Sequence, residues 1–464
     1  MPILIITLAV AAAAALGFLA TSVPPHVIFA VAAGALVSLL AFTSPKLSLG
    51  LLLVSMLFSP EIGLGALTGS RSVVVRYDDI LLVIIFLSWL ARSAVVKGRA
   101  FVTNTPVQAP ILAYTGICVL STIFGILRGD IKSQVAVFYV LKYVEYFLLY
   151  FMAVNVVETE EDIRRYLRYG FWIAMAVTLY AYLYYFSAGP DARASAPFEA
   201  PWGKPGESEP ASLGGYYIIV MGVLFGVVTS WNGPLVLWPM AALAFIFPAF
   251  LLTFSRASYI GFAAMMGMVL LKTARRRLLI LSIMLLGLGA LFGARTFYGK
   301  VKERVEMTYS GQYAVHDVGF LGVNFKLEDS AYSRYVKLRE VFLKVFPQHP
   351  VLGRGVTGVG LGDTQYALLL GEVGLLGTLA FLWMIYRLYF TASAVYSAYK
   401  DPLARAAALG MMAALPALLA QAIGVNTFII VRIMEPFWFL AAVLSVMYNR
   451  IGRREAAAVP GQKA

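Results

Sequence analysis

Charge, cysteine and histidine are all scarce in this chain of 464 residues. Only 13% of the residues are charged, and a soluble globular protein carries roughly twice that fraction. The single cysteine, Cys118, excludes an intrachain disulfide and a cysteine metal cluster, and the three scattered histidines match no zinc motif. Apolar side chains are abundant instead, at 60% of the residues with a mean hydropathy of +0.80. This composition indicates a helical protein that crosses a membrane many times.

We count about fourteen apolar segments, most of them near the length of about 20 residues that a helix needs to cross a bilayer. They cover 2–20, 26–43, 47–59, 79–96, 109–127, 133–155, 164–187, 212–230, 235–252, 256–271, 277–294, 364–395, 403–425 and 431–448. The third is short, so a span and a re-entrant helix both stay open. The first lacks a basic n-region, and we expect it to be a retained span. The predicted fold is therefore an all-α polytopic membrane protein with about 12–14 transmembrane helices.

Lysine and arginine fall in alternate connections of this map. These residues include Lys46, Arg92, Lys97, Arg164, Arg165, Arg168, Lys272, Arg276, Lys400, Arg405, Arg450 and Arg453. Because short basic loops stay on the cytoplasmic side, this side and both termini are predicted to be cytoplasmic. The topology signal explains much of the net charge of +13, so no nucleic-acid partner is expected.

Two connections on the opposite side are longer than the others. Residues 188–211 are rich in Pro, Gly, Ala and Ser, which favours a mobile, solvated loop. Residues 295–363 form a large outer loop, which separates about eleven helices in 1–294 from about three helices and a cytoplasmic tail in 364–464. Within it, SRYVKLREVFLKVF at 333–346 has apolar side chains at helical spacing. This pattern predicts an amphipathic helix beside the membrane.

The segment LLTFSRASYIG places Ser255 and Arg256 between two apolar runs, at the predicted outer boundary. An arginine at that depth either anchors a turn at the interface or binds an anion, and its planar guanidinium suits a phosphate. Other arginines are predicted on the same side, among them Arg334, Arg339 and Arg354. Several converging cations are what a lipid-linked pyrophosphate would need, although each alone also fits a lipid headgroup contact.

A glycine-rich run, GRGVTGVGLGDTQYALLLGE, leads into the next apolar segment. Its backbone N–H groups either cradle an anion or only form turns. Asp363 at the predicted helix start is a candidate general base or a helix cap. Gln365 and Tyr366 are candidates for orienting an acceptor hydroxyl. Glu372 lies deeper on the same helix face, where a carboxylate is functional or paired.

Two further charged sets have mainly structural interpretations. Lys142 and Glu145 are one helical turn apart inside an apolar segment, and we expect a buried pair. Asp78 and Asp79 precede another segment and follow Arg76. They either cap that helix or hold Arg76 and the nearby Arg71 in place.

Three stretches, taken in order, resemble the bacterial O-antigen ligase and O-antigen/exopolysaccharide polymerase superfamily. They are LLTFSRASYIG, SRYVKLREVFLKVFPQHPVLGRGVTGVG and DTQYALLLGEVGLLG. The resemblance covers about residues 240–390, and the N-terminal half matches only as a set of spans. It implies the fold of C-type integral-membrane glycosyltransferases in the bacterial inner membrane, with chemistry on the outer face. It also implies a glycan substrate on undecaprenyl pyrophosphate, without a cofactor or an obligatory metal.

By the same resemblance, Arg256 and Arg334 would bind the pyrophosphate and stabilise its charge as it leaves, with help from Arg339 or Arg354. Family ligases carry a histidine-asparagine pair at the third motif, where this chain has Asp363 and Thr364. The aspartate resembles polymerase-like members and favours a polymerase that lengthens a lipid-linked glycan. A ligase that delivers the glycan to lipid A-core is the alternative. A transporter or flippase is less favoured, because no inverted repeat is found. Expected partners are the lipid-linked oligosaccharide, membrane lipids and a chain-length regulator or other envelope glycan machinery.

Overall fold

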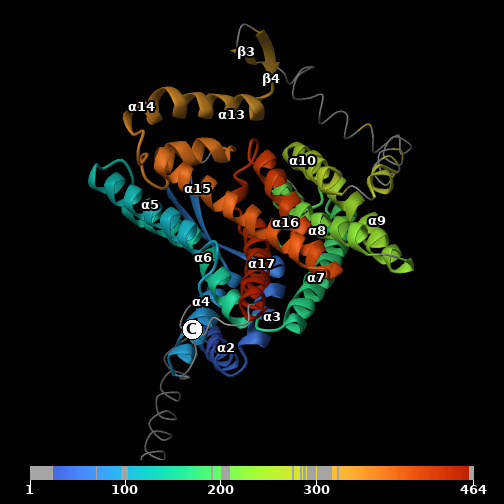
Figure 1. The fold of residues 1–464 in the computed structure, drawn as a ribbon. Helices are drawn as coiled ribbons and strands as arrows, with labels where there is room; N and C mark the ends of the chain where they lie inside the picture. The colour runs from blue at the N-terminus through green and yellow to red at the C-terminus, as the bar shows by residue number, and fades with distance from the viewer. Residues whose placement is uncertain are drawn as a thin grey trace, which may run out of the picture.

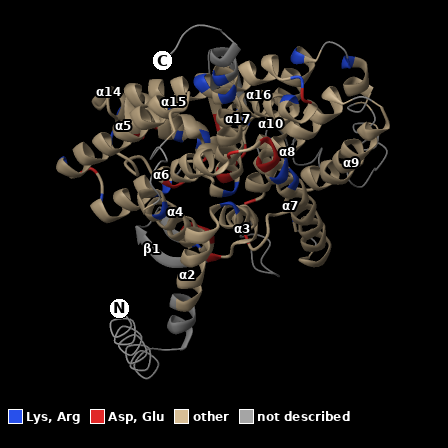
Figure 2. Cartoon of the chain, turned by 60° about the horizontal axis from the view of Figure 1, so that its bottom comes forward, with Lys and Arg blue, Asp and Glu red and all other residues tan. Residues whose placement is uncertain are grey.

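The chain folds into a bundle of helices that is capped at one end by a helix lying across it (Figure 1). This computed structural model describes residues 25–458 except 69–70, 96–102, 190–191, 200–208, 232, 274–275, 283–284, 286–288, 290–298, 300–315, 321–322 and 361. It is about 81% helical. Most residues of the helices are neither acidic nor basic, as the tan colour in Figure 2 shows.

The helices of the bundle match the apolar segments of the sequence closely. They are α2 (Pro25–Thr43), α3 (Pro45–Phe58), α4 (Tyr77–Val95), α5 (Gln108–Leu127), α6 (Ser133–Val156), α7 (Glu160–Ser187), α8 (Pro210–Ser230), α9 (Leu237–Leu251), α10 (Arg256–Lys272), α15 (Gln365–Ala398), α16 (Pro402–Gln421) and α17 (Val431–Ala458). The predicted segment 2–20 and part of 277–294 lie outside the described residues.

Shorter elements connect these helices. They are β1 (Glu61–Thr68), β2 (Arg71–Arg76), β3 (His316–Phe320), β4 (Val323–Leu327), α13 (Asp329–Glu340), α14 (Phe346–Gln348) and the single turns η2 (Pro234–Val236), η3 (Val341–Val345) and η4 (Thr427–Ile429). β1 pairs with β2, and β3 with β4, both antiparallel. The helix expected across 333–346 is confirmed, and η3 gives it one π-helical turn.

The chain is a multi-pass membrane protein. Within the described residues, seven helices are long and apolar enough to cross a bilayer. They are α5, α6, α8, α9 with η2, α15, α16 and α17. The remaining helices of the bundle, α2, α3, α4, α7 and α10, are shorter or more polar, and the predicted number of about 12–14 spans stays a prediction.

The connections gather at two ends of the bundle. At one end Lys46 pairs with Asp162 at 2.7 Å, and Arg164 pairs with Asp401 at 2.7 Å. These loops belong to the set that the lysine and arginine pattern places together. The other set meets at the opposite end, where α13 lies. The predicted topology, with the lysine- and arginine-rich end and both termini on the cytoplasmic side, stays a prediction.

Small residues let the central helices approach closely. A Cβ atom added to Gly222 of α8 would lie 3.1 Å from the carbonyl oxygen of Gly410 on α16. One turn further, Gly226 meets the backbone of Ala406 in the same way. Such close backbone contact is typical of helices that pack within a membrane. The α8–α16 pair therefore forms a firm base for the loops at the α13 end.

Candidate functional site

A cavity of about 310 Å³ lies at the α13 end of the bundle. Its charged lining residues come from several connections and helices: Glu61, Arg76, Lys142, Glu199, Glu209, Asp363 and Arg432. Its aromatic wall comes from α6, through Phe138, Tyr139, Tyr143 and Tyr146. A second cavity, of about 330 Å³, is lined by Trp89, Asn155 and Arg450 among others. None of the predicted site residues line this second cavity, whereas Asp363 lines the first.

The structure brings Arg334 and Asp363 together beside this cavity. Arg334 of α13 lies with one guanidinium nitrogen 3.4 Å from a carboxylate oxygen of Asp363. Arg256, the first residue of α10, forms an ion pair with Glu328, which immediately precedes α13. Burial lowers the pKa of the Arg334 guanidinium, Asp363 raises it, and the positive charge of Arg256 lowers it further. The two arginines are therefore close enough to interact electrostatically.

Packing of α13 and η3 on α15 explains how Arg334 reaches Asp363. Val341 and Val345 are buried against Ala367 and Leu368 in the first turns of α15. Asp363 stands just before the same helix. The apolar contact fixes the two elements side by side, and the arginine lies about two helical turns before Val341.

Asp363 is not engaged as a helix cap. The N-cap residue of α15 is Thr364, which makes no side-chain capping hydrogen bond. The Asp363 side chain is 67% exposed, and its ion pair is with Arg334. The carboxylate is thus accessible from the cavity that it lines, and its role as a base stays a prediction.

Ser255, Gln365 and Tyr366 act as local anchors. The Ser255 side chain caps α10 and accepts a hydrogen bond from the Ser258 hydroxyl at 2.8 Å. The Gln365 side-chain oxygen accepts from the backbone N–H of Phe428 at 3.0 Å, and the Tyr366 hydroxyl donates to a backbone carbonyl of α16 at 2.7 Å. Their polar groups hold the start of α10 and α15 in place, which sets the positions of Arg256 and Asp363.

The glycine-rich run fills a kink in α15. Gly374 breaks the helix there with φ 62° and ψ −161°. The N–H groups of Arg354 and Gly355 donate to the carbonyls of Gly371 and Glu372, at 2.8 and 3.0 Å. Because these two N–H groups already donate to backbone carbonyls of α15, they are not open to an anion. The glycine-rich run therefore has a structural role here, since it packs against the kink.

The buried side chain of Glu372 fixes the glycine-rich run by hydrogen bonds. The side chain is 2% exposed. Its carboxylate accepts hydrogen bonds from the Thr357 N–H at 2.9 Å and from the Tyr143 hydroxyl at 3.3 Å. A buried carboxylate with two donors is held in one position. Glu372 therefore ties the glycine-rich run to α6, whose tyrosine also lines the cavity.

Arg339 and Arg354 do not join the Arg334–Asp363 pair. Arg339 is exposed on α13, and within the described residues it makes no ion pair. Arg354 lies instead near Asp130, at 4.0 Å, and His349 is 3.9 Å from the same carboxylate. This second group lies where the α5–α6 connection meets the glycine-rich run.

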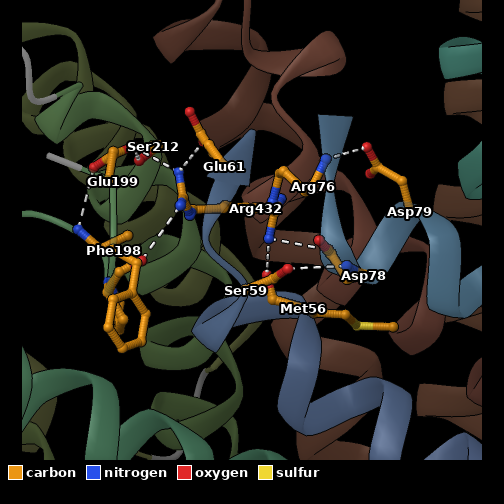
Figure 3. A network of polar contacts seen from close by, with 12 residues as sticks. Met56, Ser59, Glu61, Arg76, Asp78, Asp79, Phe198, Glu199, Ser212 and Arg432 are labelled. Carbon is orange, nitrogen blue, oxygen red and sulfur yellow. Dashed lines mark hydrogen bonds and ion pairs between the residues drawn. The ribbon is translucent and has the colours of Figure 1, made fainter. Parts of the chain in front are cut away.

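The cavity also contains carboxylates that the sequence did not single out. Arg432 of α17 pairs with Glu61 at 2.8 Å and with Glu199 at 3.3 Å, as Figure 3 shows. Glu199 belongs to the 188–211 connection. Residues 192–197 of this connection are mostly buried, and the Ala194 N–H donates to the carbonyl that follows α9 at 2.9 Å. The expectation of a solvated loop is wrong for this part, because its small alanine and serine side chains let it pack between helices.

The expected pairs of the membrane region are present. Lys142 lies 3.3 Å from Glu145 and also pairs with Asp79. Asp78 lies 3.0 Å from the Arg76 guanidinium (Figure 3). The two aspartates divide between the two alternatives. Asp78 holds the Arg76 guanidinium, whereas Asp79 accepts a hydrogen bond at 2.7 Å from the backbone N–H of Arg76, which immediately precedes α4, and so caps that helix.

Comparison with known proteins identifies no relative. No protein-family model matches the chain, and no curated protein matches it. Within the described residues, no group of three or more His, Cys, Asp or Glu side chains could hold a metal ion. The resemblance in the three motifs therefore stays a prediction, and the geometry of the cavity is what a function can be built on.

Proposed function

We propose that the protein is a membrane glycosyltransferase that lengthens a glycan carried on undecaprenyl pyrophosphate. The observation that supports this most is the position of Arg256, Arg334 and Asp363. They come from three separate motifs. Arg334 pairs with Asp363, which lines the cavity, and Arg256 pairs with Glu328 at the start of the helix that carries Arg334. A cationic pair next to an accessible carboxylate suits transfer from an anionic leaving group to a hydroxyl.

In the proposed reaction the donor pyrophosphate binds at Arg256 and Arg334. These arginines are paired here with Glu328 and Asp363, and the phosphates would take the place of those carboxylates. Fixed positive charge then stabilises the bond electrons that move onto the departing pyrophosphate oxygen. The exchange also frees the Asp363 carboxylate from its arginine.

The acceptor hydroxyl would approach from the cavity side. Its oxygen forms the new bond to the anomeric carbon while the bond from that carbon to the pyrophosphate breaks. Asp363 accepts the hydroxyl proton, so charge and atoms balance without a further reactant. Aromatic rings such as Tyr139 and Tyr143 give the cavity apolar surface on which a sugar ring can rest.

Reconstitution with a purified lipid-linked repeat unit tests this function. Wild type should give lengthened lipid-linked glycan, and Arg256→Ala and Asp363→Ala should each reduce the rate by about 10²-fold or more. Arg168→Ala, an exposed arginine on α7, is the matched control and should behave as wild type. Equal elongation by all four proteins would refute the assignment. Transfer only when lipid A-core is supplied would show a ligase.

A further inference from the structure

Each cation that lines the cavity is already neutralised by carboxyl groups. Arg432 is 4% exposed and lies between Glu61 and Glu199. Arg76 is 3% exposed and pairs with Asp78. These buried guanidinium groups are held by the protein itself (Figure 3), so they offer little free positive charge to a ligand.

Lys142, the third cation that lines the cavity, is also paired with carboxyl groups. Lys142 pairs with both Asp79 and Glu145. The cations of the cavity wall are thus outnumbered by the carboxyl groups that surround them. The described lining holds four carboxyl groups, Glu61, Glu199, Glu209 and Asp363, against three cations. A ligand inside the cavity therefore meets carboxyl oxygens more often than cationic groups.

Glu209 adds to this wall a carboxyl group that has no ion-pair partner among the described residues. It stands just before α8, its side chain is exposed to the cavity, and within the described residues no cation pairs with it. Although its side chain is accessible, the protein packed around it raises the pKa of its carboxyl to about 7. The carboxylates of Glu199, Asp363 and Glu61 raise that pKa further, and Arg432 opposes them.

We propose that this cavity binds the terminal sugar of the acceptor glycan and selects neutral or amino sugars over uronic acids, with Glu209 as the residue that excludes the anionic ring. The inference rests on the proposed function, and it names the acceptor class of that site. It also separates two subsites by charge: the anionic pyrophosphate goes to Arg256 and Arg334, and the uncharged or cationic sugar goes to the carboxylate-lined cavity.

The physical reason is desolvation beside like charge. A sugar hydroxyl donates to a carboxylate oxygen, and an ammonium group pairs with it, so both gain from the wall. A uronate carboxylate would lose its water and face Glu209 and Asp363, and among the described residues that line the cavity each cation is already paired with a carboxyl group. Placing like charges together across a binding site is strongly unfavourable. The selection should strengthen as pH rises through about 7, because Glu209 then loses its proton.

Saturation-transfer NMR on the purified full-length protein in detergent tests the inference without requiring turnover. The probes are three disaccharides that differ only in the non-reducing residue: glucose, glucosamine or glucuronic acid. At pH 8 we expect the first two to bind at least about tenfold more tightly than the third. Glu209→Gln should narrow that gap, and so should a shift of wild type to pH 6.

The matched control is Glu161→Gln, an exposed glutamate of α7 whose side chain is 82% exposed; it should keep the gap. Equal binding of all three probes, an unchanged gap in Glu209→Gln, or binding of none would each overturn the inference. A different result would count against the proposed function alone. In that case the wild-type protein would discriminate among the probes but would not elongate the lipid-linked repeat unit. If the protein elongated uronate-ended and neutral acceptors equally well, the inference about acceptor selection would be wrong and the proposed function would stand.

Discussion

The Arg432 cluster predicts a large and specific loss of stability when its cation is removed. Arg432 is 4% exposed, and the side chain of its partner Glu199 is 5% exposed. Glu61, at 35% exposed, is screened by solvent, so its pairing contributes about 0–1 kcal/mol. Most of the effect therefore comes from Glu199. Leaving that carboxylate buried without its cation should cost about 3–5 kcal/mol of the free energy of unfolding in Arg432→Met.

The pH dependence of this loss follows from the same carboxylate. Burial raises the pKa of Glu199, and the positive charge of Arg432 opposes that rise. Without Arg432 the pKa rises further. An acid with a raised folded-state pKa contributes stability that is present below its unfolded pKa and lost as pH rises through the folded pKa. The deficit of Arg432→Met relative to wild type should therefore be smallest at acidic pH and grow as pH increases.

Unfolding in mixed micelles, titrated with sodium dodecyl sulfate and followed by tryptophan fluorescence, measures this loss. The double variant Arg432→Met/Glu199→Gln is the control, because it removes the orphaned charge together with its partner. It should recover more than half of the lost stability and abolish the pH dependence of the deficit. A single variant as stable as wild type, or no recovery in the double variant, would refute the reasoning.

Three further predictions concern the glycine-rich run and helix packing, and the same titration checks each. Gly353→Ala should cost about 1–2 kcal/mol, because φ is +70° and a Cβ atom would lie 2.5 Å from the backbone of Glu372; wild-type stability would contradict this backbone conformation. Glu372→Ala should cost about 1–3 kcal/mol by orphaning two buried donors, with a smaller loss in Glu372→Gln. Gly226→Leu should destabilise the protein by forcing α8 away from Ala406 of α16. Gly116→Leu is the control and should leave stability unchanged, because a Cβ atom at Gly116 has no neighbour within 4 Å. Equal effects of the two substitutions would argue against the close α8–α16 contact.

The sequence predicted the parts of the structure that depend on local pattern. Apolar length located the helices of the bundle, and helical spacing located the helix at 333–346. The order of three motifs singled out Arg334 and Asp363, which the fold brings within 3.4 Å of each other. It also indicated the buried Lys142–Glu145 pair, since charges one turn apart in an apolar helix have few other partners.

Features set by tertiary contact escaped prediction. Glu199 and Glu209 lie in a stretch whose composition is that of a loop. The ion pair of Glu199 with Arg432 of α17 and the position of both carboxyl groups in the cavity lining are what give them a role. From the sequence, the N–H groups of the glycine-rich run could either bind an anion or form turns. In the structure two of them donate to the carbonyls of Gly371 and Glu372, which lack helical hydrogen bonds because of the kink at Gly374. A kink of that kind depends on the neighbours of α15. No spacing along the chain encodes it.

The π turn at Val341–Val345 has a consequence for the spacing of the motifs. A π turn contains one residue more than the α-helical turn that it replaces. It therefore sets the rotational phase of α13 relative to the part docked on α15. Deleting one exposed residue of this turn, such as Lys344, would convert it to an α-helical turn and leave Arg334 beside Asp363. Deleting one exposed residue of α13 after Arg334, such as Arg339, would instead rotate the preceding part of the helix by about 100° and carry Arg334 away from Asp363. The π turn is thus the one place between Arg334 and Val345 where the chain can lose a residue and keep the pairing, and a deletion within α13 would act like loss of the arginine itself.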